Sequence, residues 1–168
     1  RQLEANAATE ARAVERVVGT RLSGHGQRRY QEPRYRLYSG LVSSDLERLG
    51  QRLVGVWTTE ATHLALPGTT VGGTADVRWL EGERFLIWRS HNDHPYFPDS
   101  ISIIGGTDGL QWHYFDSRGV HRVYEFRVLE NGWEMARDAP EFSQCMTVTF
   151  EDDDEIMEGL GKLSRDDE

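Results

Sequence analysis

From about residue 53 onward, apolar and polar side chains alternate in short runs separated by turn-forming residues. The clearest example is the segment from Leu110 to Phe126, in which two runs rich in aromatic and β-branched residues flank Asp116-Ser-Arg-Gly119. A glycine in such a turn adopts positive φ at no steric cost, and period-two alternation is typical of a half-buried strand. This segment is therefore predicted to be a β-hairpin.

The same pattern recurs along the rest of the chain, with Gly, Asn and Asp at the joints. The predicted strands are residues 53–63, 70–80, 84–90, 100–106, 110–116, 120–129, 132–138, 142–151 and 155–164. Short joints between consecutive strands favour an antiparallel meander, and closure of a long meander into a barrel removes its unpaired edges. We therefore predict a mainly β protein, an antiparallel up-and-down barrel of about nine to ten strands.

Two helices are predicted before the strands. In Glu4–Leu22, apolar residues recur at steps of three and four and form one stripe, as in an amphipathic helix. A second, short helix begins at Ser44 and leads into the first strand. The predicted organisation is thus a helical, Arg- and Tyr-rich extension over residues 1–43, followed by the barrel over residues 44–168.

Several motifs within residues 44–164 resemble those of a known group of barrels. They are Leu53-Val-Gly-Val-Trp57, Trp79-Leu-Glu-Gly-Glu-Arg-Phe-Leu-Ile87, Ile103-Ile-Gly-Gly106, Tyr114-Phe-Asp-Ser-Arg-Gly119, Arg122-Val-Tyr-Glu125, Phe142-Ser-Gln144 and Phe150-Glu-Asp-Asp153. In this ordered set the chain resembles a bacterial family of lipocalin-like proteins of the calycin superfamily, with fatty-acid-binding-protein-like barrels, distantly similar to nitrobindin. The resemblance implies a short helix before the first strand and a Trp, here Trp57, that plugs one end of the barrel.

The resemblance also implies two features that this sequence lacks. Such barrels usually close with one more strand, whereas this sequence stops at Asp166-Asp-Glu168. Either the chain is truncated there or another segment, with Arg34–Ser39 as a candidate, fills the gap. Proteins similar to nitrobindin carry a late histidine that binds haem iron, but no histidine follows His121, so no cofactor is expected.

Composition limits the classes of partner. A chain of 168 residues fits one domain, and no apolar run approaches the roughly 20 residues of a membrane-spanning helix. The net charge of −9 argues against nucleic acid as a partner. A single cysteine excludes an internal disulfide and fits a cytoplasmic location. The expected partner is a small hydrophobic molecule, without nucleic acid or membrane, and a homodimer is left open.

Candidate ligand-binding residues follow from the strands around the hairpin. Because both faces of these strands mix aromatic with polar residues, as around a ligand cavity, the sequence leaves open which face is internal. Arginine binds carboxylates through two parallel hydrogen bonds, so the arginines and Tyr124 are candidates for holding an acidic or carbonyl head group. The candidate ligand-binding residues are Trp88, Arg89, His113, Tyr114, Arg122 and Tyr124.

A metal site is not predicted. His91-x-x-His94 beside Asp93 could begin one with His63 or His113, but a polar loop is the favoured interpretation. The predicted function is non-covalent binding of a small, largely apolar ligand inside the barrel. One alternative is a lipocalin-fold enzyme, an acid–base cyclase or isomerase, in which His113 pairs with Glu125 or Asp116 as the base and a tyrosine is the acid. The other is an interaction module acting through the N-terminal helix.

Overall fold

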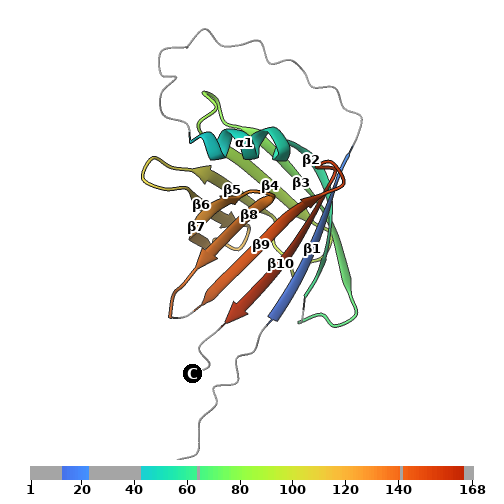
Figure 1. Ribbon diagram of the computed structural model, residues 1–168. Helices are drawn as coiled ribbons and strands as arrows, with labels where there is room; N and C mark the ends of the chain where they lie inside the picture. Colours follow the sequence, from blue (N-terminus) through green and yellow to red (C-terminus); the bar gives the residue numbers. More distant parts are fainter. Residues whose placement is uncertain (1–12, 23–42, 64, 141, 165–168) are drawn as a thin grey trace, which may run out of the picture.

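The protein is a closed barrel of ten antiparallel strands, in which consecutive strands pair and the first strand also pairs with the last (Figure 1). The computed structural model describes residues 13–22, 43–63, 65–140 and 142–164. The strands are β1 (Ala13–Arg21), β2 (Gly55–Thr62), β3 (Thr70–Trp79), β4 (Leu86–Asn92), β5 (Ser100–Gly105), β6 (Gln111–Asp116), β7 (His121–Leu129), β8 (Gly132–Arg137), β9 (Ser143–Glu151) and β10 (Ile156–Ser164). The predicted antiparallel up-and-down barrel is therefore confirmed, and β2 to β10 correspond to the nine strands predicted from alternation.

The turns between strands use the residues that their geometry requires. Gly119 closes the turn between β6 and β7 with φ of 82° and donates its backbone N–H to the carbonyl of Asp116 at 2.9 Å. Gly132 begins β8 so close to β9 that a Cβ atom there would lie 1.9 Å from the carbonyl oxygen of Val148. Only glycine fits such an approach, which helps to fix the pairing of β8 with β9.

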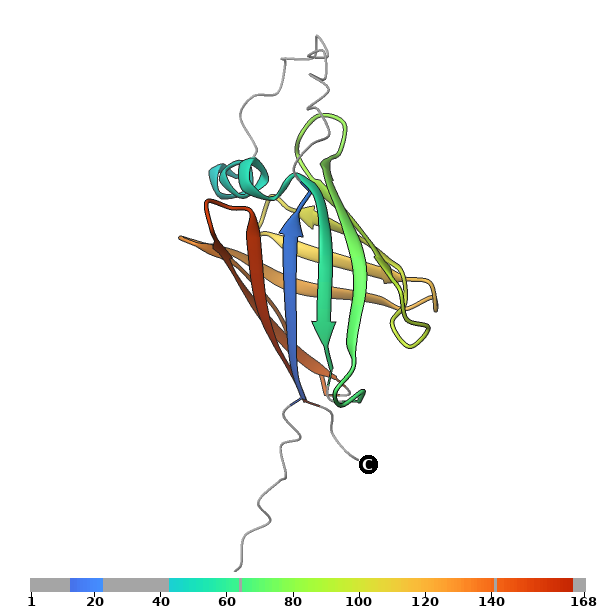
Figure 2. The ribbon, with the colours of Figure 1, turned by 90° about the vertical axis from the view of Figure 1, so that its right-hand side faces the viewer.

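One helix, α1 (Ser44–Leu53), lies across one end of the barrel (Figure 2). Leu46, Leu49 and Leu53 on its inner face are each at most 1% exposed. Trp57, at the start of β2, is fully buried beneath the helix and donates its indole N–H to the carbonyl of Leu53 at 2.9 Å. The expected short helix is thus present, and it closes this end of the barrel together with the indole of Trp57.

The prediction of a helix over Glu4–Leu22 is wrong for residues 13–21, which form β1; residues 4–12 lie outside the described residues. A spacing of four residues, as between Val14, Val18 and Leu22, places side chains on one face of a strand as well as of a helix, so the stripe did not discriminate between them. The strand is favoured because β2 and β10 each offer an edge, and β1 pairs with both.

The position expected for an additional closing strand is therefore taken by a segment from the start of the chain. β1 lies between β10 and β2 and completes the ring (Figure 2). The candidate segment Arg34–Ser39 lies outside the described residues. The boundary expected between an extension (residues 1–43) and the barrel (residues 44–168) consequently separates β1 from the other strands of the barrel, although β1 completes the barrel. Within the described ranges, no helix has the length and apolar character needed to cross a membrane.

Candidate functional site

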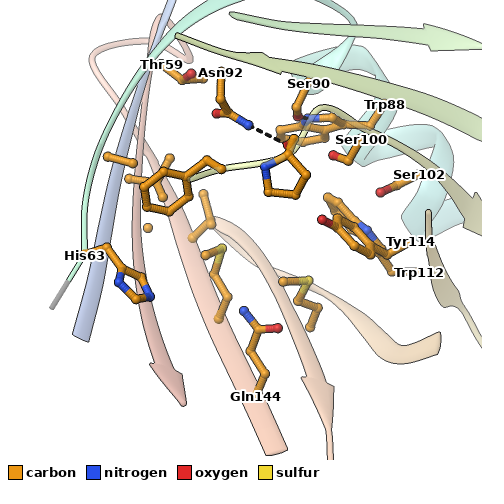
Figure 3. Close-up of a pocket in the computed structure, with 18 of the residues that line it drawn as sticks. Thr59, His63, Trp88, Ser90, Asn92, Ser100, Ser102, Trp112, Tyr114 and Gln144 are labelled. Carbon is orange, nitrogen blue, oxygen red and sulfur yellow. Dashed lines mark hydrogen bonds between the residues drawn. The ribbon is translucent and has the colours of Figure 1, made fainter. Parts of the chain in front are cut away.

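The interior of the barrel contains a cavity of about 760 Å³ (Figure 3). The chain enters β2 directly from α1, so the end of β2 and the following His63 lie at the opposite end of the barrel. His63 and Phe97, from two loops at that end, line the cavity together with inward side chains of the strands. The cavity therefore extends from the mouth of the barrel toward the end that α1 closes.

A row of four inward side chains crosses four neighbouring strands. Trp88 of β4 is directly opposite Ser102 of β5, Ser102 is opposite Tyr114 of β6, and Tyr114 is opposite Arg122 of β7. All four line the cavity. Ser102 is 2% exposed. The row brings an indole, a hydroxyl, a phenol and a guanidinium onto one wall.

Aromatic rings pack deeper in the barrel, beneath this row. The ring centroids of Trp112 lie 5.2 Å from those of both Trp88 and Trp133, and Phe126 is 5.7 Å from Trp112 and Trp133. The side chain of Trp133 is 3% exposed, and its buried indole nitrogen has no hydrogen-bond partner among the described residues. A buried donor without an acceptor costs about 1–3 kcal/mol, so this cluster is packed for apolar contact rather than for hydrogen bonding.

The opposite wall is made by thioethers and small residues. The chain has three methionines, Met135 of β8, Met146 of β9 and Met157 of β10, and all three line the cavity. β9 is diametrically opposite β4 in the ring of strands, so Met146 faces the Trp88 side across the lumen. Glycines at positions 19 and 159 also line this side. Methionine is flexible and polarizable, which allows this wall to adapt to the shape of an apolar occupant.

Asp116 holds the turn at the mouth. The side chain of Asp116 is fully buried. Its Oδ2 atom accepts hydrogen bonds from the Arg118 guanidinium at 2.7 Å and from the Tyr114 hydroxyl at 3.1 Å. Its Oδ1 atom accepts hydrogen bonds from the backbone N–H groups of Arg118 and Val120. Burial alone would raise the pKa of Asp116, but these hydrogen bonds outweigh it and lower the pKa to about 2. Burial, followed by the charge of Asp116, raises the pKa of Tyr114. The carboxylate is therefore ionised and the phenol is neutral near pH 7.

Arg122 is held by packing rather than by an ion pair. Its guanidinium carbon lies 4.1 Å from the centroid of the Phe142 ring. Among the described residues, no carboxylate forms an ion pair with it. Next along β7, the hydroxyl of Tyr124 donates to Oε1 of Gln144 at 2.8 Å. The amide nitrogen of Gln144 and the edge of the Arg122 guanidinium thus offer N–H donors at one side of the cavity.

The structure brings four of the six predicted ligand-binding residues together. Trp88, Tyr114, Arg122 and Tyr124 line the cavity. Arg89 and His113 do not, because they occupy alternate positions on β4 and β6 and lie on the outer surface of the barrel. His113 Nε2 lies 3.1 Å from Oε1 of Gln111 on the same outer face. The proposed acid–base pair of His113 with Asp116 is not formed, since Asp116 belongs to the inner face.

Sequence reasoning missed several inward residues. Ser102, Trp133, Gln144 and the methionines were not singled out. Residues 100–106 were predicted as a strand with no inward face assigned; Ser100 and Ser102 are internal, while Ile101 is 44% exposed. The inward position of Ser102 follows from the register, which places Trp88 and Tyr114 opposite it.

The histidines at the mouth contact neighbouring carboxylates and backbone groups. Nδ1 of His91 lies 2.9 Å from Oδ1 of Asp99, and Nε2 lies 3.6 Å from Oδ1 of Asp93. The hydrogen bond to Asp99 is the main cause that raises the pKa of His91 and lowers the pKa of Asp99. His94 accepts a hydrogen bond from the backbone of Tyr96 through Nδ1. Over the ranges that the structure describes, no three His, Cys, Asp or Glu residues are grouped so that they could hold a metal ion.

The chain matches no family model, and no curated protein or solved structure matches it. The resemblance to lipocalin-like barrels accordingly remains a prediction from sequence motifs, whereas the closed ten-stranded barrel is a property of the structure. A function for this chain has to be argued from the cavity itself.

Proposed function

We propose that this protein binds a small, largely apolar molecule non-covalently in the barrel, with the polar end of that molecule at the row formed by Trp88, Ser102, Tyr114 and Arg122. The observation that carries the proposal is one cavity that combines aromatic and thioether walls with a row of side chains bearing a hydroxyl, a phenol and a guanidinium. Ligand pockets are typically lined in this way, because apolar area supplies affinity and a few polar groups fix orientation.

The size of the cavity supports the same function. Ligand pockets commonly measure about 300–1,000 Å³, and the cavity of about 760 Å³ lies within that range. Barrel diameter grows with strand number, and about eight strands already leave room for one small ligand.

No observation favours the enzyme or the interaction module over binding. His113, the predicted base, lies on the outer face of β6, and burial together with Asp116 raises the pKa of Tyr114, which makes its phenol a weaker acid. Residues 13–21 of the predicted interaction helix are incorporated into the barrel as β1. The relationship to calycin-type ligand binders, proposed from the sequence motifs, agrees with binding as the function.

Native mass spectrometry tests this function. The protein is purified from its own host and measured at low collision energy and again after denaturation. We expect a small-molecule adduct that is lost on denaturation. Protein that is folded by circular dichroism but carries no adduct, and that binds no member of a panel of apolar acids, alcohols and aromatics, would refute the proposal.

A cavity-filling variant locates the adduct. Ala61 of β2 lines the cavity, whereas Glu60, the preceding residue, is exposed and does not line it. We expect Ala61→Phe to abolish the adduct and Glu60→Phe to retain it, with both variants folded by circular dichroism. Retention of the adduct by a folded Ala61→Phe variant would place the bound molecule outside the barrel.

A further inference from the structure

The charge of the cavity is opposite to that of the protein. The chain contains 28 acidic residues and has a net charge of −9. Among the described residues that line the cavity, however, there are two arginines and no Asp, Glu or Lys. A cavity with one sign of charge and low-dielectric walls focuses the potential inside it. The carboxylate of Asp116 pairs with Arg118, so the remaining positive charge, on Arg122, makes the lumen electrostatically suited to an anion.

The two arginines differ in how much of their charge is available. Arg118 is paired with the buried carboxylate of Asp116 at 2.7 Å and is committed to the turn. Arg122 is half-buried, stacks on Phe142 and forms no ion pair with any described residue. A guanidinium stacked through its face keeps its N–H donors in the ring plane, where they can bind a carboxylate with two parallel hydrogen bonds. Arg122 is the anchor that the cavity offers.

The walls on either side of this anchor favour a flat ring system. Trp88, Trp112 and Tyr114 lie on β4 and β6, and Figure 3 shows them gathered on one side of the cavity, with Gln144 on the other. Met146 and Met157 belong to β9 and β10, across the lumen from β4 and β5. Aromatic rings gain from offset or edge contacts with other rings and from contacts with thioether sulfur. An occupant between these walls is contacted favourably on both faces if it is itself aromatic.

We propose that the ligand is a planar aromatic acid, with its ring system between the aromatic and methionine walls and its carboxylate on Arg122. This inference rests on the proposed binding function and specifies its ligand class. Ser102, two strands away in the same row, and the amide nitrogen of Gln144 also line the cavity and supply further donors. The cavity selects for two properties at once, negative charge and planarity.

Three related probes separate these two properties by isothermal titration calorimetry. The probes are 2-naphthoate, its neutral amide 2-naphthamide, and the saturated acid decahydro-2-naphthoate. A charge-assisted hydrogen bond is worth about 1.5–3 kcal/mol, so we expect 2-naphthoate to bind about tenfold to a hundredfold more tightly than 2-naphthamide. We expect the saturated acid to bind more weakly than 2-naphthoate, because it has no flat π-faces to stack on the two walls.

Variants of two arginines assign the charge preference to one residue. Arg122→Gln should lose about tenfold or more in affinity for 2-naphthoate while its affinity for 2-naphthamide stays within a few-fold. Arg89→Gln is the matched control, because Arg89 has the same side chain but lies on the outer surface of β4. It should bind both probes as the unsubstituted protein does. The preference of the unsubstituted protein for acid over amide needs no variant and therefore remains decisive if Arg122→Gln fails to fold.

The outcomes distinguish this inference from the proposed function. Equal affinity for acid and amide, or tighter binding of the saturated acid than of 2-naphthoate, would overturn the planar aromatic acid while leaving ligand binding intact. An equal loss of affinity for 2-naphthoate and 2-naphthamide in Arg122→Gln would assign Arg122 a structural role and would also overturn the planar aromatic acid as the ligand. Absence of binding by every probe, together with a bare chain in native mass spectra, would reject the binding function itself.

Discussion

The phenolic hydroxyl of Tyr114 donates a hydrogen bond to Oδ2 of Asp116 at 3.1 Å, two residues along the same strand. Both side chains point to the interior, and the same oxygen receives the Arg118 guanidinium. One buried carboxylate thus fixes the phenol at the cavity row, the arginine of the turn and two backbone amides. The mouth of the barrel next to the proposed anchor Arg122 is built around Asp116.

Asp116→Asn should destabilise the fold. The amide keeps the shape of the side chain but replaces one acceptor oxygen with a donor, so Arg118, Tyr114 or a backbone amide loses its partner. Leaving buried polar groups unpaired costs about 1–3 kcal/mol, and we expect the free energy of unfolding in urea to fall by that amount. Asp108→Asn is the control, because Asp108 is exposed in the turn between β5 and β6. Equal stability of the two variants would contradict the central role of Asp116.

The same carboxylate predicts a pH dependence of stability. The pKa of Asp116 is lowered from 3.8 to about 2 in the folded protein, so its contribution is complete above the unfolded value and is lost as the pH falls through the folded one. The stability advantage of the unsubstituted protein over Asp116→Asn should therefore shrink between about pH 4 and pH 2. Urea unfolding of both proteins across this range measures it. A pH-independent difference would show that the carboxylate is not held in its ionised form.

Much of this architecture follows from local patterns. The nine strands from β2 to β10 were predictable because alternation and turn residues both indicate strands, and the short helix before them was expected to begin at Ser44, as α1 does. β1 was not, because the spacing of Val14 and Val18 satisfies both helical and strand periodicity and only the free edges of β2 and β10 decide between them. Four of the six candidate site residues line the cavity. The other two were not excluded beforehand, because the inward faces of β4 and β6 follow from their register with β5, and the sequence of a single strand does not reveal that register.

His91 should titrate at a higher pH than an ordinary histidine. Its hydrogen bond with Asp99 raises the pKa of the imidazole above 6.5, and the charge of Asp93 raises it less. Because the folded pKa is raised, the stabilisation from this pair is present below pH 6.5 and is lost as the pH rises through the folded pKa. We expect Asp99→Asn to return the pKa of His91 toward 6.5 in an NMR titration and Asp93→Asn to change it less. The reverse order of effects would show that Asp93 is the main partner.

Gly50→Ala should loosen the closed end of the barrel. An ideal Cβ at Gly50 would lie 2.1 Å from Cζ2 of Trp79, so α1 or the indole has to move. Overpacking of this kind typically costs about 1–3 kcal/mol, although alanine favours a helix more than glycine does. Gln51→Ala, at the neighbouring exposed position of α1, serves as the control and should change the unfolding free energy by less than about 0.5 kcal/mol. A Gly50→Ala variant as stable as the unsubstituted protein would mean that α1 packs more loosely on Trp79 than the structure shows.

Arg52 fastens α1 to the turn between β9 and β10, and this link can be measured directly. Its Nε and Nη2 atoms lie 2.8 and 2.5 Å from Oδ1 of Asp154, and its guanidinium stacks over the Phe150 ring at 4.2 Å. The pair is partly exposed, which weakens it through solvent screening, but two hydrogen bonds and ring stacking set it apart from an isolated surface pair. A double-mutant cycle of Arg52→Ala and Asp154→Ala should give a coupling energy of about 0.5–1 kcal/mol in urea unfolding.

The exposed pair of Arg48 and Asp45, at 3.2 Å within α1, provides the comparison and should couple by about 0.5 kcal/mol or less. Equal coupling of the two pairs would assign the attachment of α1 to its buried leucines alone.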